Sequence, residues 1–332
     1  MSHDDLSQRD PFRRTEPGAT PSKTSARQRR AQPPPESVEA PQPQDENHKV
    51  FGLGIATAET RQPAYGQGVV VSLLVAAGLL LLAIISIGDG AHSDPPVLEQ
   101  TDFLFWLVSG AVLLIAAGGA QFAERTASRA AEGVGQTRPK MAMATAWAVP
   151  LSATFAAIML VATYHNRPML IVGPLIAFLG IAGALLSRDL LDEADEQSGR
   201  VASTIHTLVV HAVAFLGFSA IYLNKLDSWI SAPLVGLLGG ILILETLERG
   251  GAKPPQRVFY AVLGGWVLAS VTIALNWWPT YGWTGGAVLL AVFYAIAGLL
   301  LVHTQRSEVD RRDLIEFGGV GGAALLILAI MS

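Results

Sequence analysis

Residues 201–247 read VASTIHTLVVHAVAFLGFSAIYLNKLDSWISAPLVGLLGGILILETL and contain two apolar segments, 201–223 and 229–247. A third apolar segment, 258–277, follows after another short turn. Each segment has close to the ~20 residues that a helix needs to cross a bilayer, and is much longer than a membrane-spanning strand. Because lipid offers backbone groups no partner, only helices and closed barrels span a membrane. This stretch therefore predicts antiparallel membrane helices joined by very short turns.

The same pattern extends over the rest of the chain. The residues are 51% hydrophobic and 15% charged, whereas about 25% are charged in a typical soluble domain. From Tyr65 onward, the sequence predicts an all-α fold, a polytopic membrane helix bundle of about nine transmembrane helices in residues 65–332. The apolar segments run approximately over 68–87, 103–122, 141–164, 168–187, 201–223, 229–247, 258–277, 283–303 and 314–331.

Residues 1–64 have a different composition. They contain nine of the nineteen prolines, together with nine Lys/Arg and nine Asp/Glu residues. Such a segment cannot bury enough apolar area to offset the entropy of ordering it. We therefore expect a disordered, Pro-rich cytoplasmic tail. Two interpretations stay open: a solvated tail, or a tail whose basic patches around Arg13 and Arg29 contact anionic lipid head groups.

The basic residues predict the orientation. The tail and every second loop after it hold nine, four, two, three and three Lys/Arg residues, 21 in all, whereas the other loops hold only Arg167 and Lys225. Cytoplasmic loops of membrane proteins are enriched in Lys and Arg. We therefore expect a protein of the bacterial cytoplasmic (inner) membrane, with its N-terminus in the cytoplasm and its C-terminus outside.

Several classes of function find no support. The chain has no cysteine, which excludes disulfides and thiolate metal sites, and its net charge of −4 gives no reason to expect nucleic acid binding. No phosphate-binding loop, zinc motif or nucleophile elbow is present, so a soluble-type enzyme finds no support and we expect no cofactor or metal; a membrane-embedded enzyme stays a third alternative. An acidic cluster could hold a hard divalent cation, but its spacing matches no calcium loop and favours a solvated helix end. The cluster comprises Asp189, Asp192, Glu193, Asp195 and Glu196.

Four polar residues in apolar surroundings form a candidate intramembrane site. His206 and Glu245 lie on consecutive segments, at counted depths that match to about 3 Å, and Glu316 begins the last segment at a similar level. His211 lies near the midplane, where it is either a proton carrier or ligand contact, or a neutral ring bonded to a neighbouring helix. The alternative for Glu245 and Glu316 is that they extend to the nearby cytoplasmic surface.

Prolines and glycines predict local features of the helices. Pro150, Pro174 and Pro233 are expected to kink their helices by interrupting the backbone hydrogen bonds. The pairs Gly236/Gly240 and Gly318/Gly322 have the spacing that lets another helix approach closely.

The C-terminal half contains the stretches YLNKLDSWISAP (222–233), ALNWWP (274–279), VFYAIAGLL (292–300) and LIEFGG (314–319). With these stretches it resembles a bacterial family of multi-pass membrane proteins defined as a domain of unknown function. The resemblance covers roughly residues 201–317. It implies a membrane helix bundle without a known activity, so it transfers no functional residue.

Two functions remain open. The first is transporter-like handling of a small solute, proton or lipid, supported by the proline-containing helices and by His206, His211 and Glu245. The second is a non-catalytic membrane scaffold or assembly subunit that recruits a partner through its tail. The expected partners are the lipid bilayer, a protein bound through residues 1–64, and further copies of the same chain. A polar cavity reaching His211 would favour the first function, and a dry, fully packed bundle the second.

Overall fold

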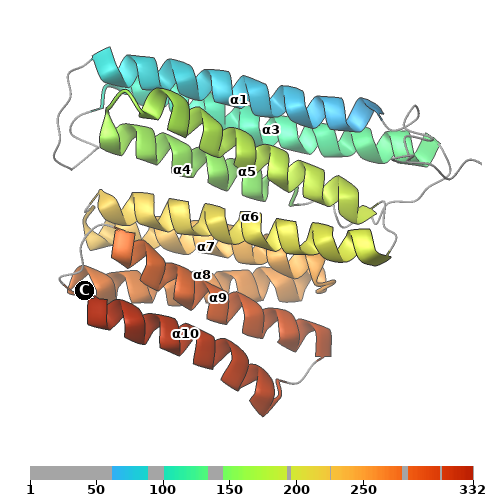
Figure 1. Ribbon diagram of the computed structural model, residues 1–332, viewed down its shortest axis with the longest axis vertical. Coiled ribbons are helices and arrows are strands. Elements are labelled where there is room, and N and C mark those ends of the chain that lie inside the picture. The colour runs from blue at the N-terminus through green and yellow to red at the C-terminus, as the bar shows by residue number, and fades with distance from the viewer. Residues whose placement is uncertain are drawn as a thin grey trace, which may run out of the picture. The chain divides into compact units, whose positions relative to one another are not determined.

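The computed structural model of the protein describes residues 62–88, 101–133, 145–192, 196–224, 226–278, 283–306 and 309–331. Every regular element within these ranges is an α-helix, and Figure 1 shows how the helices are arranged. They are α1 (Gln62–Gly88), α3 (Phe103–Gly133), α4 (Ala148–Tyr164), α5 (Met169–Asp192), α6 (Glu196–Leu223), α7 (Ser228–Arg249), α8 (Pro254–Asn276), α9 (Trp283–Arg306) and α10 (Arg311–Met331).

The predicted all-α fold is confirmed, and each predicted apolar segment coincides with a helix. Eight of the described helices are long and apolar enough to cross a membrane. Several extend past the apolar segment that predicted them. Helix α3, for example, continues to Gly133 through a stretch rich in Ala, Glu and Arg, which are good helix formers in water. Residues 1–61, which form most of the predicted tail, lie outside the described residues.

Helix α4 is shorter than predicted. The apolar segment covers residues 141–164, but the helix begins at Ala148 and has 17 residues, or about 26 Å at ~1.5 Å per residue. Thirteen of these residues are buried, and the helix packs against α3, α5 and α6. A helix that is apolar on all sides is typical of a buried position. The high apolar content of α4 is therefore explained by its burial among neighbouring helices as well as by crossing of the membrane.

The helices form two groups, α1 to α5 and α6 to α10 (Figure 1). One core cluster draws on α1, α3, α4 and α5 and includes the fully buried Leu79 and Ile181. A second cluster, with the fully buried Leu242 and Phe293, draws mainly on α6 to α9 and also contains residues of α4 and α5. The two groups meet where α6 packs against α4 and α5, so α6 has neighbours on both sides.

Glycines let α7 and α8 pack closely. A Cβ atom added at Gly236 would lie 2.9 Å from the carbonyl oxygen of Gly265, and one added at Gly265 would lie 2.5 Å from that of Gly236. The close approach predicted for Gly236 and Gly240 is confirmed. On α10, by contrast, a Cβ atom added at Gly318 or Gly322 would have no heavy atom within 4 Å. This second pair therefore packs against no other helix in the described part of the chain.

The prolines do not all act as predicted. Pro174 and Pro233 lie inside α5 and α7, where each removes a backbone donor from its helix. Pro150 is the third residue of α4. Backbone N–H groups in the first turn have no partner within the helix, so Pro150 interrupts nothing. The kink predicted there is wrong, because the helix begins later than the apolar segment suggested.

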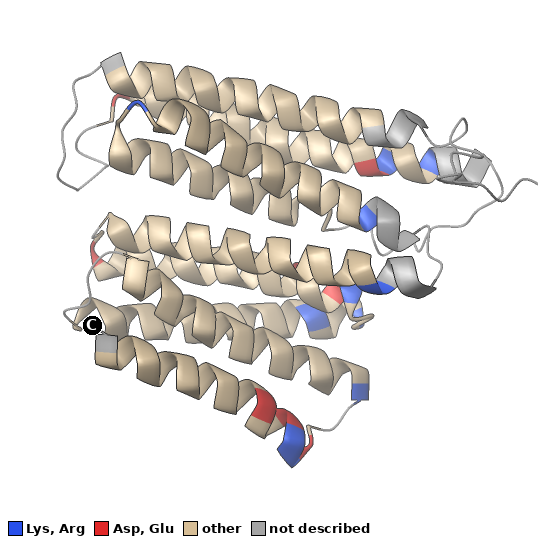
Figure 2. Ribbon diagram, viewed as in Figure 1, with Lys and Arg blue, Asp and Glu red and all other residues tan. Residues whose placement is uncertain are grey.

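Lys and Arg residues gather at one end of the helices (Figure 2). This is the end at which α5 and α7 finish and α6 and α8 begin, and we call it the charged end. Basic residues from separate connections thus lie at the same level, as the alternation of charge along the sequence predicts.

Candidate functional site

His206 and Glu245 meet inside the bundle near its charged end. Nε2 of His206 on α6 lies 2.9 Å from Oε1 and 3.1 Å from Oε2 of Glu245 on α7. Only 3% of His206 and 1% of Glu245 are exposed. An unpaired charge at a helix centre in a membrane costs roughly 2.5–3.5 kcal/mol by insertion scales. The contact therefore gives each of the two side chains a polar partner that the surrounding apolar residues cannot supply.

The other nitrogen of the same ring faces a hydroxyl group. Nδ1 of His206 lies 2.8 Å from Oγ of Ser187 on α5, and this hydroxyl lies 3.0 Å from the backbone carbonyl oxygen of Ala184. An ionised carboxylate only accepts hydrogen bonds, so Nε2 of His206 carries the hydrogen that faces Glu245. A hydroxyl both donates and accepts.

Both protonation states of His206 therefore have a complete set of hydrogen bonds. In the neutral ring, the Ser187 hydroxyl donates to Nδ1. In the charged ring, Nδ1 donates to the Ser187 oxygen, and the hydroxyl turns to donate to the Ala184 carbonyl. Only the direction of the Ser187 hydroxyl differs between the two states.

A second cation keeps Glu245 paired. Nε of Arg249, one turn further along α7, lies 2.7 Å from Oε1 of Glu245. Side chains four residues apart lie on the same face of a helix. His206 can therefore gain or lose a proton without leaving the carboxylate of Glu245 alone.

A second cluster surrounds Glu248 on the same face of α7. Nη1 of Arg257 on α8 lies 2.9 Å from Oε1 of Glu248, and Nη2 of Arg188 on α5 lies 3.7 Å from Oε2. The hydroxyl of Thr145, just before α4, donates to Oε2 of Glu248. Thr145 in turn accepts from Arg188 at 3.2 Å. Because Glu245 and Glu248 are three residues apart, one buried face of α7 carries both clusters.

Together these side chains form what we call the charge network. With a neutral His206, its three arginines and two glutamates carry one net positive charge, and a proton on His206 makes two. The network connects α5 of the first helix group with α6, α7 and α8 of the second. It comprises Thr145, Ser187, Arg188, His206, Glu245, Glu248, Arg249 and Arg257. Chemically, this arrangement can hold the two groups together and can also bind a proton at one defined ring.

His211 lies apart from the charge network. Its Nδ1 is 2.8 Å from the backbone carbonyl oxygen of Thr207, within its own helix. The ring makes edge contacts with Phe293 and Tyr294 of α9, at centroid distances of 5.4 and 5.9 Å. The hydrogen bond of His211 is therefore made within its own helix. The interpretation that predicted a bond to a neighbouring helix does not describe it. It lies on the wall of a cavity of about 440 Å³ between α6, α9 and α10.

Glu316 is the fourth candidate residue, and the structure does not place it in the charge network. It lies in the first turns of α10, a helix that packs against α9, and its side chain is exposed. The counted depth correctly puts Glu316 toward the charged end. Depth alone does not specify which helix a residue faces.

Sequence reasoning missed six members of the charge network. Arg188, Arg249 and Arg257 were counted only as basic residues of connections, and Glu248, Ser187 and Thr145 were not considered. One signal was available, since Glu245, Glu248 and Arg249 have the spacing of a single helix face. No comparable signal identifies Thr145 or Ser187, because their partners come from helices that are distant in the sequence.

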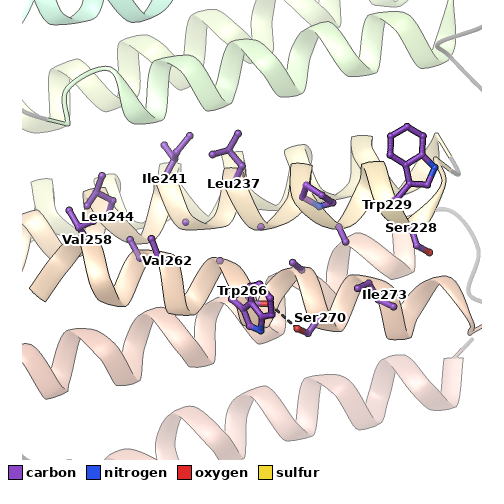
Figure 3. Close-up of a pocket in the computed structure, with 17 residues that line it drawn as sticks. Ser228, Trp229, Leu237, Ile241, Leu244, Val258, Val262, Trp266, Ser270 and Ile273 are labelled. Atoms are coloured by element: carbon purple, nitrogen blue, oxygen red, sulfur yellow. Dashed lines mark hydrogen bonds between the residues drawn. The ribbon is translucent and has the colours of Figure 1, made fainter.

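A groove with a volume of about 660 Å³ runs between α7 and α8 (Figure 3). It is larger than the cavity beside His211. Its lining is apolar except for the hydroxyl groups of two serines and the indole N–H groups of Trp229 and Trp266. Ser270 donates to the backbone oxygen of Trp266 at 3.0 Å, and Ser228 accepts from the amide of Asn276 at 2.9 Å. The groove therefore offers a mainly apolar surface with a few polar groups in its wall.

Among the described residues there is no group of three or more His, Asp or Glu side chains suited to a metal ion. The side chains of the acidic cluster that begins at Asp189 lie outside what the structure describes.

Comparison with known proteins gives one match. Residues 95–331 match the model of a family described as Protein of unknown function (DUF5656). The match extends well before residue 201, where the resemblance seen in the sequence began, and so includes α3, α4 and α5. No curated protein and no solved structure matches the chain.

Proposed function

This chain belongs to the family of proteins of unknown function DUF5656, and we propose that it is a transporter-like membrane protein that binds a proton at His206 and Glu245. The observation that carries the proposal is the position of His206 between Glu245 and Ser187. Ionisable side chains inside membrane helices commonly mark proton relays and substrate pathways.

The hydrogen bonds support a proton site over a purely structural ion pair. A structural pair needs partners for one protonation state only. Here the Ser187 hydroxyl supplies a partner for Nδ1 of His206 in both states, and Arg249 keeps Glu245 paired in both. A proton can therefore enter and leave without creating an unsatisfied buried group, which would cost about 1–3 kcal/mol.

The proposal includes a location and an orientation. The protein lies in the cytoplasmic (inner) membrane of a bacterium, with the residues before α1 in the cytoplasm and the C-terminus outside. The charged end of the bundle then faces the cytoplasm. The support is the partition of 21 basic residues against two along the sequence, since positive charge favours the cytoplasmic side.

Proton movement in liposomes tests the proposal. The full chain is reconstituted with a total bacterial lipid extract, which supplies lipid cargo, around a pH-sensitive dye. Under a potassium diffusion potential, we expect faster acidification than in empty liposomes and than with His206→Gln, which removes the titrating ring. Glu316→Gln is the matched control, because it neutralises an exposed carboxylate outside the network, and it should behave like the wild type. Equal rates for wild type and empty liposomes would refute proton transport.

A scaffold is the second candidate function, and α10 favours it. This is the least buried of the eight spans, and its Gly318/Gly322 face has no neighbour among the described residues. Such a face suits the close approach of a helix from a partner or a second copy. Affinity purification of the full chain, with mass spectrometry of bound proteins and lipids, separates the two functions. A stoichiometric protein that is lost on deletion of residues 1–50, or when Gly318 and Gly322 are both replaced by leucine, supports the scaffold, whereas the absence of any such protein supports the transporter.

A further inference from the structure

The cavity beside His211 has an apolar lining with one imidazole side chain in its wall. Ten described residues of α6, α9 and α10 line its volume of about 440 Å³, which lies within the usual range of ligand pockets, about 300–1,000 Å³. Eight of the ten are aliphatic or glycine, and the remaining two are His211 and Tyr294. The occupant must therefore be mostly apolar.

The hydrogen bond of His211 determines what the ring offers to that occupant. A backbone carbonyl only accepts, so Nδ1 of His211 carries the hydrogen that points to Thr207. In the neutral ring, the hydrogen bond to Thr207 therefore leaves Nε2 as an acceptor. A ligand that uses this nitrogen must supply a hydrogen-bond donor.

The depth of His211 narrows the class of ligand further. It lies eleven residues after Arg200 and twelve before Leu223, the two ends of its span. Eleven residues correspond to about 16 Å, which is close to the middle of a hydrocarbon core of about 30 Å. Phospholipid head groups stay at the interface, and their acyl chains carry no donor. A lipid that supplies a donor at this depth therefore has to be one that enters the hydrocarbon itself.

We infer that the cavity between α6, α9 and α10 binds a neutral lipid alcohol, whose hydroxyl donates to Nε2 of His211 and whose chains fill the apolar part. An imidazole acceptor distinguishes this cavity from the larger α7–α8 groove, whose lining contains no histidine. The idea that the protein transports this lipid alcohol rests on the proposed function. Its binding to the cavity does not depend on a proton at His206.

Photo-crosslinking with a matched pair of probes tests the inference. The full chain is placed in nanodiscs of phosphatidylcholine and phosphatidylglycerol. One probe is a diacylglycerol with a diazirine in its acyl chain, and the other is the same molecule with its hydroxyl acetylated. Mass spectrometry then locates the labelled peptides. We expect the free alcohol to label α6, α9 and α10 about fivefold more than the acetylated probe, the ratio that one net hydrogen bond gives.

Variants identify the residue responsible. His211→Phe retains an aromatic ring against Phe293 and should abolish the difference between the probes, whereas His211→Gln, which keeps an acceptor, should retain part of it. His303→Phe on α9 is the matched control, because His303 pairs with Tyr260 and does not line the cavity. His206→Gln should leave labelling unchanged, which separates this inference from the proton proposal.

Three results would overturn the inference. They are equal labelling of the cavity by both probes, labelling confined to the α7–α8 groove, and an undiminished difference between probes in His211→Phe. The comparison of the two probes on the wild-type chain decides the matter even when a variant fails to fold.

Discussion

Nε2 of His206 on α6 lies 2.9 Å from Oε1 of Glu245 on α7, and both side chains are almost completely buried. Two helices that follow each other in the chain thus bring an imidazole and a carboxylate together within an apolar bundle. Ser187 on the opposite side of the ring connects this pair to α5. The stability of the bundle and its proposed function therefore depend on the same contacts.

Removing the carboxylate should destabilise the bundle. Glu245→Ala takes the acceptor from Nε2 of His206, and removing one partner of a buried ion pair costs about 3–5 kcal/mol. We expect a clearly lower thermal unfolding midpoint in mild detergent. Glu316→Ala is the control, because an exposed side chain typically changes stability by no more than about 0.5 kcal/mol. Equal midpoints for the two variants would mean that the pair adds nothing to stability.

The two glycine pairs should respond differently to alanine. In Gly265→Ala, the new Cβ atom would lie 2.5 Å from the backbone oxygen of Gly236, so α7 and α8 must separate, at a cost of about 1–3 kcal/mol. In Gly322→Ala, the Cβ atom meets open space, and the better helix propensity of alanine should leave stability unchanged or improved. Thermal unfolding of the purified variants measures both. A stable Gly265→Ala protein would show that the close helix contact is not required.

The orientation can be tested with reporters. A reporter fused after Ser332 should be active only outside the cytoplasm, and one placed before Tyr65 only inside it. The reason is the partition of basic residues, 21 against two, between alternating connections. A further reporter in the connection that contains Arg167 provides an internal check and should be extracytoplasmic. Finding both chain ends on the same side would require an even number of crossings.

Much of the fold could be predicted because a membrane helix can be identified from the composition of its own segment, with little information from the rest of the chain. A run of about twenty apolar residues has few alternatives in lipid, so each helix of the described ranges was located, although α3 ends later and α4 begins later than predicted. The start of α4 was predicted too early, because a run of apolar residues is expected both in a membrane-crossing helix and in any buried segment. The part of segment 141–164 that becomes this helix begins at Ala148 and packs among α3, α5 and α6.

The site was only partly predictable, for a different reason. Counting residues along two consecutive antiparallel helices puts His206 and Glu245 at one level, and a short turn makes them neighbours. The same counting fails for Glu316, because its depth does not reveal that α10 packs against α9 and leaves the side chain exposed. Arg188 and Thr145 were missed because contacts between helices distant in the sequence have no pattern in a single chain.

The most direct test of the central claim is the protonation state of His206. The full chain, labelled with ¹⁵N-histidine and embedded in lipid bilayers, is titrated downward from about pH 8, through the range in which histidine ordinarily changes charge, to the lowest pH at which the bundle stays folded. Solid-state NMR reports each ring nitrogen, and the signals absent from His206→Gln belong to His206. We predict a ring with hydrogen only on Nε2 at the upper end of this range, and a ring with hydrogen on both nitrogens at the lower end. A ring that keeps one protonation state throughout would show that the charge network is a fixed structural clamp, and would contradict the proton site.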